Sequence, residues 1–427
     1  MFVLYEIDSK EIHSFFFNIK ISQEITMKIY ILANFTRALD GETTGRFSFL
    51  ASELSKRGHQ VKLVITDFYH GTKSPRPEPH YEKYDFEIVM CHEPGYKGNV
   101  TPQRLYSHYI WGKNVAEYLK KAEKPDVVYC AIPSLTVAVE AGKYCKRNGV
   151  KFIVDVQDLW PEAFSMVFKN NLFKLAFKPM EWYVNKAYAM ADLAIGVSET
   201  YVNRVLSVNK KTKSGVAVFL GNNGQLFEDS AEKYRKEYND GTIRLCYIGT
   251  LSQSYDIKMV VDALVMASSR MKQHFKFMVI GDGVYKDDFE TYAKQKEIDC
   301  EFTGLMDYPK MVGELCACDI VINPIKKGSA ASIINKVGDY AQSGLPVINT
   351  QESEEYRKLI DDYGCGINCR CENAEDVAAA IVKLAQSPEL RREMGEAAKR
   401  LAKDKFDRRY SYARIIDAVE ELGQTKR

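Results

Sequence analysis

The chain has 427 residues, of which 46% are hydrophobic and 27% are charged, so it can bury the cores of two domains. Lysine and arginine number 59 against 57 for aspartate and glutamate, and the formal net charge of +2 gives no general attraction to nucleic acid or to acidic lipid. No run of about 18 apolar residues predicts a membrane span. We therefore expect a cytoplasmic protein whose basic sites are local.

The ten cysteines are too sparse for a disulfide scaffold, which is typical of a reducing cytosol. The tightest group, Cys365, Cys369 and Cys371, lacks a second pair of ligands and a nearby histidine. A structural zinc site needs such a complete set. We therefore expect no metal ion.

Residues 1–26 precede the first strand-like run and fit neither a secretory signal nor a transit peptide, because acidic residues are spread through them. We expect translation to start at Met27, or residues 1–26 to be a loose N-terminal extension. An intact Met1 in mass spectrometry of the native protein would contradict the first alternative.

Strands and helices alternate after Met27, which is typical of a parallel sheet. The first strand is predicted over 28–33. A helix is predicted next, because the apolar residues Phe47, Leu50, Ala51 and Leu54 recur at i, i+3, i+4 and i+7, and Gly58 ends it. Further elements of this first unit are strands over 61–66, 126–130 and 151–156 and a helix over 135–146.

A polar, basic stretch at 207–215 without periodicity is the best candidate for a linker. A second alternation follows it, with strands predicted over 244–249, 277–281, 300–302, 319–322 and 345–348. Helices are predicted over 259–271, 374–385, 388–403 and 410–422. The expected fold class is therefore α/β, with two doubly wound, Rossmann-like domains facing a cleft.

Parallel α/β domains bind ligands where strands end and helices begin, so a phosphate ligand is the first expectation. Small residues that let a backbone approach a diphosphate occur in four loops, at 41–45, 249–252, 281–283 and 327–332. Each loop is a weak signal alone, because glycine after a strand is more often turn chemistry. The absence of a Gly-x-Gly-x-x-Gly motif and of a P-loop counts against a nicotinamide dehydrogenase or an NTPase.

The most informative segment is 332–348. On a helix, Ser332, Lys336 and Asp339 would share one face. One interpretation is a surface ion pair between the last two. The other assigns Lys336 to a phosphate and Asp339 to the vicinal hydroxyls of a ribose.

This segment resembles the nucleotide-sugar motif of the retaining glycosyltransferases of family 4, in which a lysine precedes an acidic residue by three positions, followed by Tyr-Ala, a glycine and Pro-Val-Ile. The resemblance extends from Met27 to the C-terminus. Its other landmarks follow in the family's order: 45–47, 53–61, 155–161, 191–192, 197–198, 247–251, 279–283, 302–304 and 318–324.

Within this family the chain resembles bacterial capsular and exopolysaccharide glycosyltransferases. The resemblance implies the GT-B fold. The first domain, 27–210, would bind the acceptor, and the second, 211–405, the nucleotide sugar. Residues 406–427 would form a C-terminal helix that packs back on the first domain. The resemblance also implies that neither a metal nor another cofactor is required. A protein base would not be needed either, because the departing diphosphate can itself take the acceptor proton.

The resemblance also implies the site residues. Catalysis is expected to rest on Lys336, Arg46 and Asp158. The donor is expected to lie against Gly45, Gly249, Thr250, Leu251, Gly281, Gly283, Gly304, Ser329, Ala331, Ser332, Lys336 and Asp339. Asp158 and Trp160 are expected on the acceptor side, although Trp160 and Pro161 could equally cap a strand.

The chain departs from the family pattern in three places. Ala331 stands where many members have a glutamate that contacts the donor sugar, so backbone amides nearby would replace it. Thr250 and Tyr255 lie in the loop where many members place Arg and Lys, which leaves Arg46 and Lys336 as the expected cations. Gln157 replaces a frequent histidine, so no histidine base is available there.

Aromatic residues and lysines alternate over Phe164 to Tyr183, which fits either a membrane-interface helix or a helix pair packed on the first domain. The resemblance favours contact with the inner face of the cytoplasmic membrane. The expected function is transfer of a sugar, of hexosyl or N-acetylhexosaminyl type, from a UDP-linked donor to a lipid-linked or growing glycan in surface polysaccharide biosynthesis. The alternatives are a nucleotide-sugar 2-epimerase of the same fold and a non-catalytic nucleotide-sugar-binding scaffold.

Overall fold

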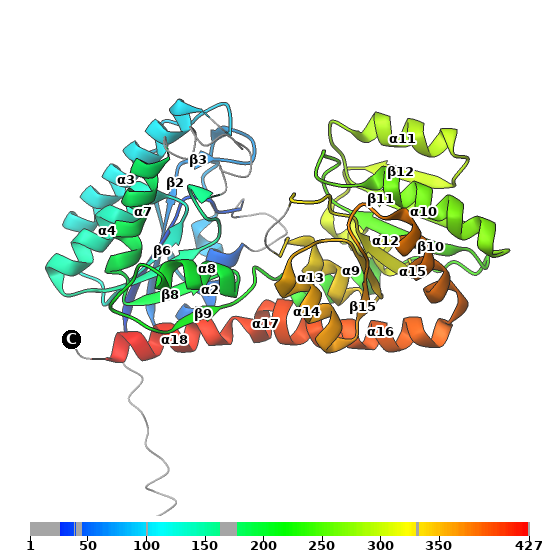
Figure 1. Cartoon of the computed structure of the whole chain (residues 1–427). Helices are drawn as coiled ribbons and strands as arrows, with labels where there is room; N and C mark the ends of the chain where they lie inside the picture. Colours follow the sequence, from blue (N-terminus) through cyan, green and yellow to red (C-terminus); the bar gives the residue numbers. More distant parts are fainter. Residues whose placement is uncertain are drawn as a thin grey trace, which may run out of the picture.

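The structure, a computed structural model, describes residues 26–37, 39, 45–99, 101–162, 177–329 and 333–425. Two domains, each built on a parallel sheet, lie side by side, and the C-terminal helices run along the base of both (Figure 1). The expected N-terminal extension lies outside the described residues apart from Thr26. None of the described helices is long and apolar enough to cross a membrane.

The first sheet has seven strands in the order β5-β2-β1-β6-β7-β8-β9, all parallel. Its strands are β1 (Lys28–Ala33), β2 (Gln60–Thr66), β5 (Glu87–Cys91), β6 (Val127–Ile132), β7 (Lys151–Val156), β8 (Leu193–Gly196) and β9 (Gly215–Ala217). All six residues of the central strand β6 are buried, because helices cover both faces of the sheet.

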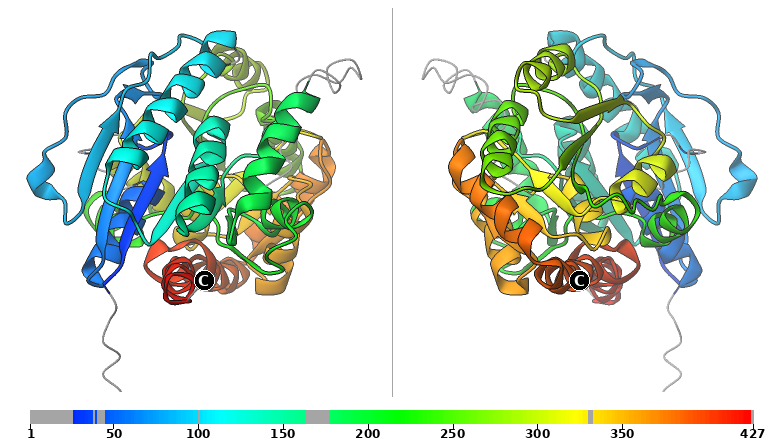
Figure 2. Two further views of the ribbon diagram at one scale, coloured as in Figure 1. Left: turned by 90° about the vertical axis from the view of Figure 1, so that its left-hand side faces the viewer. Right: turned by 90° about the vertical axis from the view of Figure 1, so that its right-hand side faces the viewer.

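Three helices cover one face of this sheet side by side, as Figure 2 shows from the first domain's side. They are α3 (Pro102–Lys121), α4 (Leu135–Asn148) and α7 (Lys178–Met190). On the other face α2 (Arg46–Lys56) buries Phe47, Leu50 and Leu54, the positions that its periodicity predicts. A shorter helix, α8 (Glu199–Leu206), follows β8, and the small hairpin of β3 (Phe68–Tyr69) and β4 (Ser74–Pro75) lies beyond β2.

The second sheet has six parallel strands in the order β12-β11-β10-β13-β14-β15. The strands are β10 (Ile243–Ile248), β11 (Phe275–Ile280), β12 (Cys300–Gly304), β13 (Ile320–Asn323), β14 (Val347–Asn349) and β15 (Gly366–Asn368). The helices around them are α9 (Gly224–Tyr234), α10 (Ile257–Arg270), α11 (Lys286–Gln295), α12 (Tyr308–Cys316), α13 (Lys336–Gln342), α14 (Glu354–Tyr363), α15 (Ala374–Gln386) and α16 (Pro388–Leu401). The strand order reverses between β10 and β13, which is where such sheets bind ligands.

The domain boundary lies later in the chain than the expected position between residues 210 and 211. Strand β9 pairs with β8 and so belongs to the first sheet. The polar stretch 207–215 is therefore no linker. Its Asn209 is buried and donates to the carbonyl oxygens of Tyr188 and Ala191, so the polar side chain stabilises a turn inside the first domain.

The chain crosses between the domains twice, and the two crossings lie side by side. The amide of Asn222 donates to the Phe406 carbonyl (2.9 Å), and that of Arg408 donates to the Asn222 carbonyl (3.2 Å). A π-helical turn, η2 (Ala402–Phe406), and α17 (Arg408–Ser411) carry the second crossing into α18 (Ala413–Gln424). Ile415, Ile416 and Val419 of α18 are buried in the first domain's core, as expected for a C-terminal helix that packs back.

A buried ion pair ties these parts together. Arg46, at the start of α2, donates from Nε to Asp155 Oδ2 (2.7 Å), and both side chains are almost wholly buried. Its Nη1 donates to the Tyr412 hydroxyl of the returning chain (3.1 Å) and to the Val218 carbonyl of the first crossing (3.2 Å). Arg46 therefore joins a helix, a strand and both crossings.

We expect Asp155→Asn to lower the free energy of unfolding by about 3–5 kcal/mol, because it leaves a buried guanidinium without its counter-charge. Asp417→Asn is the matched control. It removes an exposed ion pair to Arg57 that also joins α2 to α18, and its cost should stay below about 1 kcal/mol. Urea unfolding of both variants measures the difference, and equal costs would contradict the role given to Arg46.

Candidate active site

The largest candidate site lies between the domains at the carboxyl ends of their strands. A cleft of about 740 Å³ is bordered by Gln157 and Asp158, which follow β7 of the first domain. From the second domain, the loops after β10 and β11 and the start of α13 contribute Gly249, Gly281 and Lys336. The sheet topology therefore brings three of the predicted sequence signals to one place.

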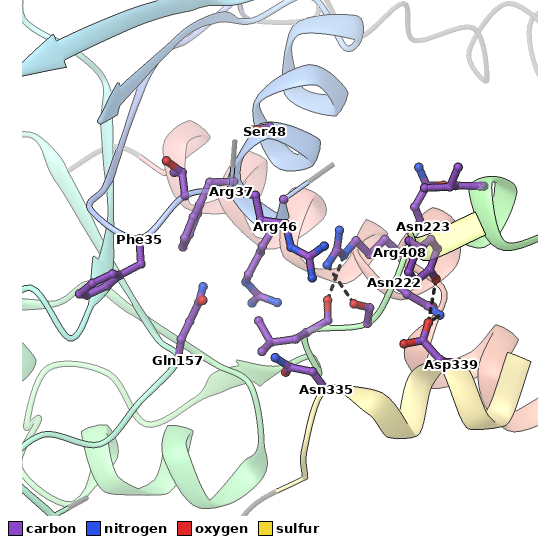
Figure 3. Close-up of a pocket in the computed structure, with 17 residues that line it drawn as sticks. Phe35, Arg37, Arg46, Ser48, Gln157, Asn222, Asn223, Asn335, Asp339 and Arg408 are labelled. Atoms are coloured by element: carbon purple, nitrogen blue, oxygen red, sulfur yellow. Dashed lines mark hydrogen bonds between the residues drawn. The ribbon is translucent and has the colours of Figure 1, made fainter. Parts of the chain in front are cut away.

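A smaller hollow of about 260 Å³ adjoins this cleft on the side of the two chain crossings (Figure 3). It is lined by Phe35, Arg37, Gly45, Arg46, Asn222 and Arg408, among others. Gln157, Asn335 and Asp339 line both spaces, so the two form one continuous candidate site.

Lys336 supplies a desolvated cation in the cleft. Its Nζ donates to the Tyr247 hydroxyl (3.0 Å) and lies 4.1 Å and 3.9 Å from the ring centres of Tyr247 and Tyr255. Burial lowers the pKa of Lys336 well below its usual value. No carboxylate among the described residues forms an ion pair with Lys336, so an anionic ligand in the cleft would favour its charged form.

Asp339 projects toward a different set of partners. Its Oδ1 accepts hydrogen bonds from the Tyr308 hydroxyl (2.7 Å) and from Asn222 Nδ2 (2.8 Å), the second of which Figure 3 shows. Burial raises the pKa of Asp339, and these two hydrogen bonds act against that rise. Because both bonds use Oδ1, Oδ2 has no hydrogen-bond partner among the described residues and can accept from a ligand hydroxyl.

The interpretation of Lys336 and Asp339 as a surface ion pair is wrong, because no ion pair joins them in the described structure and each has its own partners. Helix α13 begins at Lys336. The helix that was expected to include Ser332 cannot be assessed, since Ala331 and Ser332 lie outside the described residues.

Glycines let the two loops of the second domain interlock. Gly249 and Gly281 have φ angles of +129° and +148°. A Cβ at Gly281 would overlap the Gly249 carbonyl, and a Cβ at Gly249 would overlap the Lys336 ammonium group. The Leu251 amide donates to the Asp282 carbonyl, which holds the loops together. Glycine at these positions is therefore required by packing, whatever the loops bind.

Arg46 is not the free cation that was expected. Each of its three guanidinium nitrogens donates within the protein, to Asp155, Tyr412 and the backbone of the first crossing. Although Arg46 borders the smaller hollow, it acts there as a structural residue. The expectation failed because the sequence shows a basic residue beside a glycine loop but not the acidic residue 109 positions later that neutralises it.

Asp158 borders the cleft, whereas Trp160 is buried beneath it. The Trp160 indole donates to Asp158 Oδ2 (3.1 Å), and its ring stacks on His108. Burial raises the pKa of Asp158. Trp160 therefore positions Asp158 and does not itself line the cleft.

Thr250 lines the cleft, but four other residues expected at the donor line neither space: Leu251, Gly283, Gly304 and Ser329. Leu251 is instead fully buried in the second domain's core. The structure adds residues that were not predicted as site residues, namely Asn222, Tyr247, Tyr308 and Asn335. The structure also places Tyr255 in the cleft. Tyr255 had a signal in the sequence, because it lies in the loop where many family members have a cation.

The three clustered cysteines are separate from this site. Burial raises the pKa of Cys365, Cys369 and Cys371 to about 11, so these thiols stay protonated at neutral pH. The Cys371 thiol donates to the Ile325 carbonyl (3.0 Å), which is a structural contact.

Two family models match the chain and together span most of it. Residues 48–214 match the model described as Glycosyltransferase Family 4, and residues 229–401 match the model described as Glycosyl transferases group 1. Two uncharacterised glycosyltransferases of Methanocaldococcus jannaschii are similar in sequence. MJ1069 is 24% identical over 345 residues, covering 80% of this chain and 76% of that protein, and MJ1178 is 21% identical over 351 residues, covering 80% and 86%.

Solved structures share the fold at low sequence identity. Alr3699/HepE of Anabaena in complex with UDP is 14% identical, with a TM-score of 0.64 over 92% of this chain and all of that chain. WaaG, a glycosyltransferase involved in lipopolysaccharide biosynthesis, is 16% identical, with a TM-score of 0.63 over 92% and 99%. The fold is therefore the GT-B arrangement of two Rossmann-like domains.

We expect Gly281→Ala to destabilise the second domain and distort the cleft, because its Cβ would overlap backbone atoms that cannot rotate away. Gly149→Ala is the control, since Gly149 also has a positive φ but no atom lies near its added Cβ. The control should cost about 1–2 kcal/mol from backbone strain alone. Thermal unfolding of the two variants should show the larger loss for Gly281→Ala, and the reverse order would contradict the interlocked loops.

Proposed function

We propose that this chain, which belongs to glycosyltransferase family 4, transfers a sugar from a UDP-linked donor to a glycan acceptor. The anomeric configuration of the sugar is retained. The observation that carries the proposal is the pair of separate polar centres on α13. Lys336 offers a cation without a carboxylate partner, and Asp339 offers a free carboxylate oxygen three residues later. A diphosphate and a ribose need these two groups at neighbouring positions.

The bound states of structural neighbours support a UDP-linked donor. Alr3699/HepE has been solved with UDP and with UDP-glucose. Residues 229–401, which match the group 1 model, contain the loop glycines, Lys336 and Asp339. We therefore place the nucleotide against the second domain and the transferred sugar toward Gln157 and Asp158.

The chemical step needs stabilisation of the leaving diphosphate more than it needs a protein base. The bond between the anomeric carbon and the diphosphate oxygen breaks, and the acceptor oxygen attacks from the same face. Its proton passes to the departing diphosphate. Lys336 would stabilise the negative charge that develops, and its desolvation would strengthen this interaction.

We expect Lys336→Ala to lower turnover about a hundredfold or more, the usual cost of removing one group that stabilises developing charge. Lys358→Ala is the control, because Lys358 is exposed on α14 and pairs only with Asp362. UDP at about 100 times its dissociation constant should add roughly 2.7 kcal/mol to the stability of the wild type, in the presence of a chelator. Lys336→Ala and Asp339→Ala should reduce the corresponding shift in melting temperature.

Near wild-type turnover in Lys336→Ala with intact nucleotide binding would refute the assignment of Lys336. Absence of a shift with each of UDP, GDP and ADP would contradict the proposed donor site. Formation of a glycosylated product separates the transferase from the scaffold. A 2-epimerase would instead change the nucleotide sugar without an acceptor. One structural neighbour, from Listeria monocytogenes, is described as a proposed UDP-N-acetylglucosamine 2-epimerase.

The proposed acceptor is a lipid-linked glycan, reached at the inner face of the cytoplasmic membrane. Most of the predicted segment Phe164 to Tyr183 lies outside the described residues, but neighbouring side chains support a membrane contact. Trp182 on α7 is 61% exposed, with the Lys186 ammonium over its ring. On α3, Leu105, Tyr106 and Tyr109 are also exposed. Exposed aromatic residues beside lysines are typical of membrane-interface surfaces.

We expect the wild type to float with liposomes that contain anionic lipid, and the triple variant Leu105→Ser, Tyr106→Ser, Trp182→Ser to remain at the bottom of the gradient. Tyr81→Ser is the control, since Tyr81 is exposed in the η1 turn (Tyr81–Lys83), outside α3 and α7. Charge reversal at Lys169, Lys174 and Lys178 tests the predicted segment directly. Equal flotation of all variants, or none by the wild type, would contradict this contact.

A further inference from the structure

A group of basic and aromatic side chains lies in the first domain, outside the donor site described above. It occurs in the loops after β1, β5 and β7, in the turn between β3 and β4, and in the first turns of α3. Its members are Phe35, His70, Lys73, Tyr96, Arg104, His108 and Trp160. We call this group the basic aromatic cluster.

Arg104 lies at the centre of the basic aromatic cluster. Its guanidinium carbon is 4.6 Å from the ring centre of Trp160, 5.3 Å from that of Phe35 and 5.5 Å from that of Tyr96. Nη1 donates to the Asn99 carbonyl (2.6 Å), while the buried Nε has no hydrogen-bond partner among the described residues. Arg104 therefore retains donor capacity that the protein does not use.

The carboxylates near Arg104 do not neutralise it. Glu93 is buried and accepts hydrogen bonds from Asn34 and Ser107, and Asp158 accepts from the Trp160 indole. Both carboxylates act on Arg104 through their charge, but neither forms an ion pair with it in the part of the chain that the structure describes. The guanidinium is thus surrounded by aromatic rings without a paired counter-charge.

Lys73 adds a second cation to the cluster. Its Nζ donates to the His70 carbonyl (2.5 Å), lies 3.0 Å from His70 Nδ1 and lies 5.5 Å from the ring centre of Tyr96. Burial and the charge of Arg104 lower the pKa of Lys73. Burial also lowers the pKa of His70 to about 4 and that of His108 to about 3, so both histidines are neutral at pH 7. The two remaining cations, Arg104 and Lys73, repel each other, and neither forms an ion pair with a carboxylate among the described residues.

The basic aromatic cluster borders the proposed active site on the acceptor side. Phe35 lines the smaller hollow, and Asp158, which Trp160 holds, lines the larger cleft. Lys336 occupies the opposite, second-domain wall of that cleft. An anion bound between Arg104 and Lys73 would therefore belong to a ligand of the first domain, distinct from the donor diphosphate.

We propose that Arg104 and Lys73 form a subsite for an acidic group of the acceptor, either a phosphate or a sugar carboxylate. The proposal rests on the proposed transferase function and names the acceptor class more closely. A guanidinium packed between aromatic faces keeps, along its edge, the donors that no protein group uses, and these can form a hydrogen bond to such a group. The aromatic rings hold that edge in place and exclude water, which strengthens the interaction with an anion.

The experiment follows the indole N–H signals of the full chain labelled with ¹⁵N-tryptophan, which has three tryptophans. UDP is present at saturation, so that the donor site is filled. The probes are methyl phosphate, methyl glucuronide and the neutral methyl glucoside. We expect an acidic probe to shift the Trp160 signal saturably and to leave the signal of Trp182 unchanged, whereas methyl glucoside should shift neither.

We expect Arg104→Gln and Lys73→Gln each to weaken this binding about tenfold to a hundredfold, the range for losing a hydrogen bond to a charged group. Lys113→Gln is the matched control, because Lys113 is also on α3 and also lies over an aromatic ring, that of Tyr109. The control should bind the probe as the wild type does. The melting-temperature shift with UDP should persist in all three variants, which shows that they remain folded.

A response to methyl phosphate alone supports a phosphorylated acceptor, and a response to methyl glucuronide alone supports an acidic sugar. A response to both supports a general anion subsite. The subsite is overturned if neither probe shifts the Trp160 signal, or if Arg104→Gln binds as tightly as Lys113→Gln. Failure of UDP to bind would refute the proposed donor and leave the probe titration interpretable on its own.

Discussion

The arrangement of the two domains depends on the buried ion pair between Arg46 and Asp155. A guanidinium without a counter-charge would be costly at this depth, so the two residues must come together for the first domain to fold. The same guanidinium also binds Tyr412 and the Val218 carbonyl, which belong to the returning chain and to the first crossing. The Arg46 guanidinium thus holds both crossings where they leave the first domain. The crossings in turn determine the position of the cleft.

The crossings also contact the proposed donor site. Asn222 pairs through its backbone with the second crossing and donates from its side chain to Asp339. A ribose bound to Asp339 would therefore contact a carboxylate that already accepts a hydrogen bond from Asn222, in the first crossing between the domains. This contact gives a physical route by which nucleotide binding and the relative position of the domains can influence each other.

Much of the fold could be predicted because parallel strands covered on both faces are continuous apolar runs, as in β6. Helix α3 could not be predicted in this way, because its buried face includes Ser107, His108 and Gly112. These polar or small residues obscure the apolar periodicity of a helix. Strand β9 was missed because it has three half-buried residues in a polar context. Within the site, the spacing of Lys336 and Asp339 is local, whereas Asp339's partners Tyr308 and Asn222 are 31 and 117 residues distant and leave no local signal.

Two cations, Lys336 in the cleft and Arg104 in the basic aromatic cluster, are held in the same way. Lys336 lies over two tyrosine rings in the second domain, and Arg104 lies between three aromatic rings in the first. Holding a partly buried cation without a carboxylate lowers stability, and such a cost is characteristic of functional sites. Aromatic faces stabilise the charge only in part and leave its hydrogen-bond donors available. An anionic group beside each of the two cations would satisfy both, which is the charge pattern of a nucleotide-sugar donor beside an acidic acceptor.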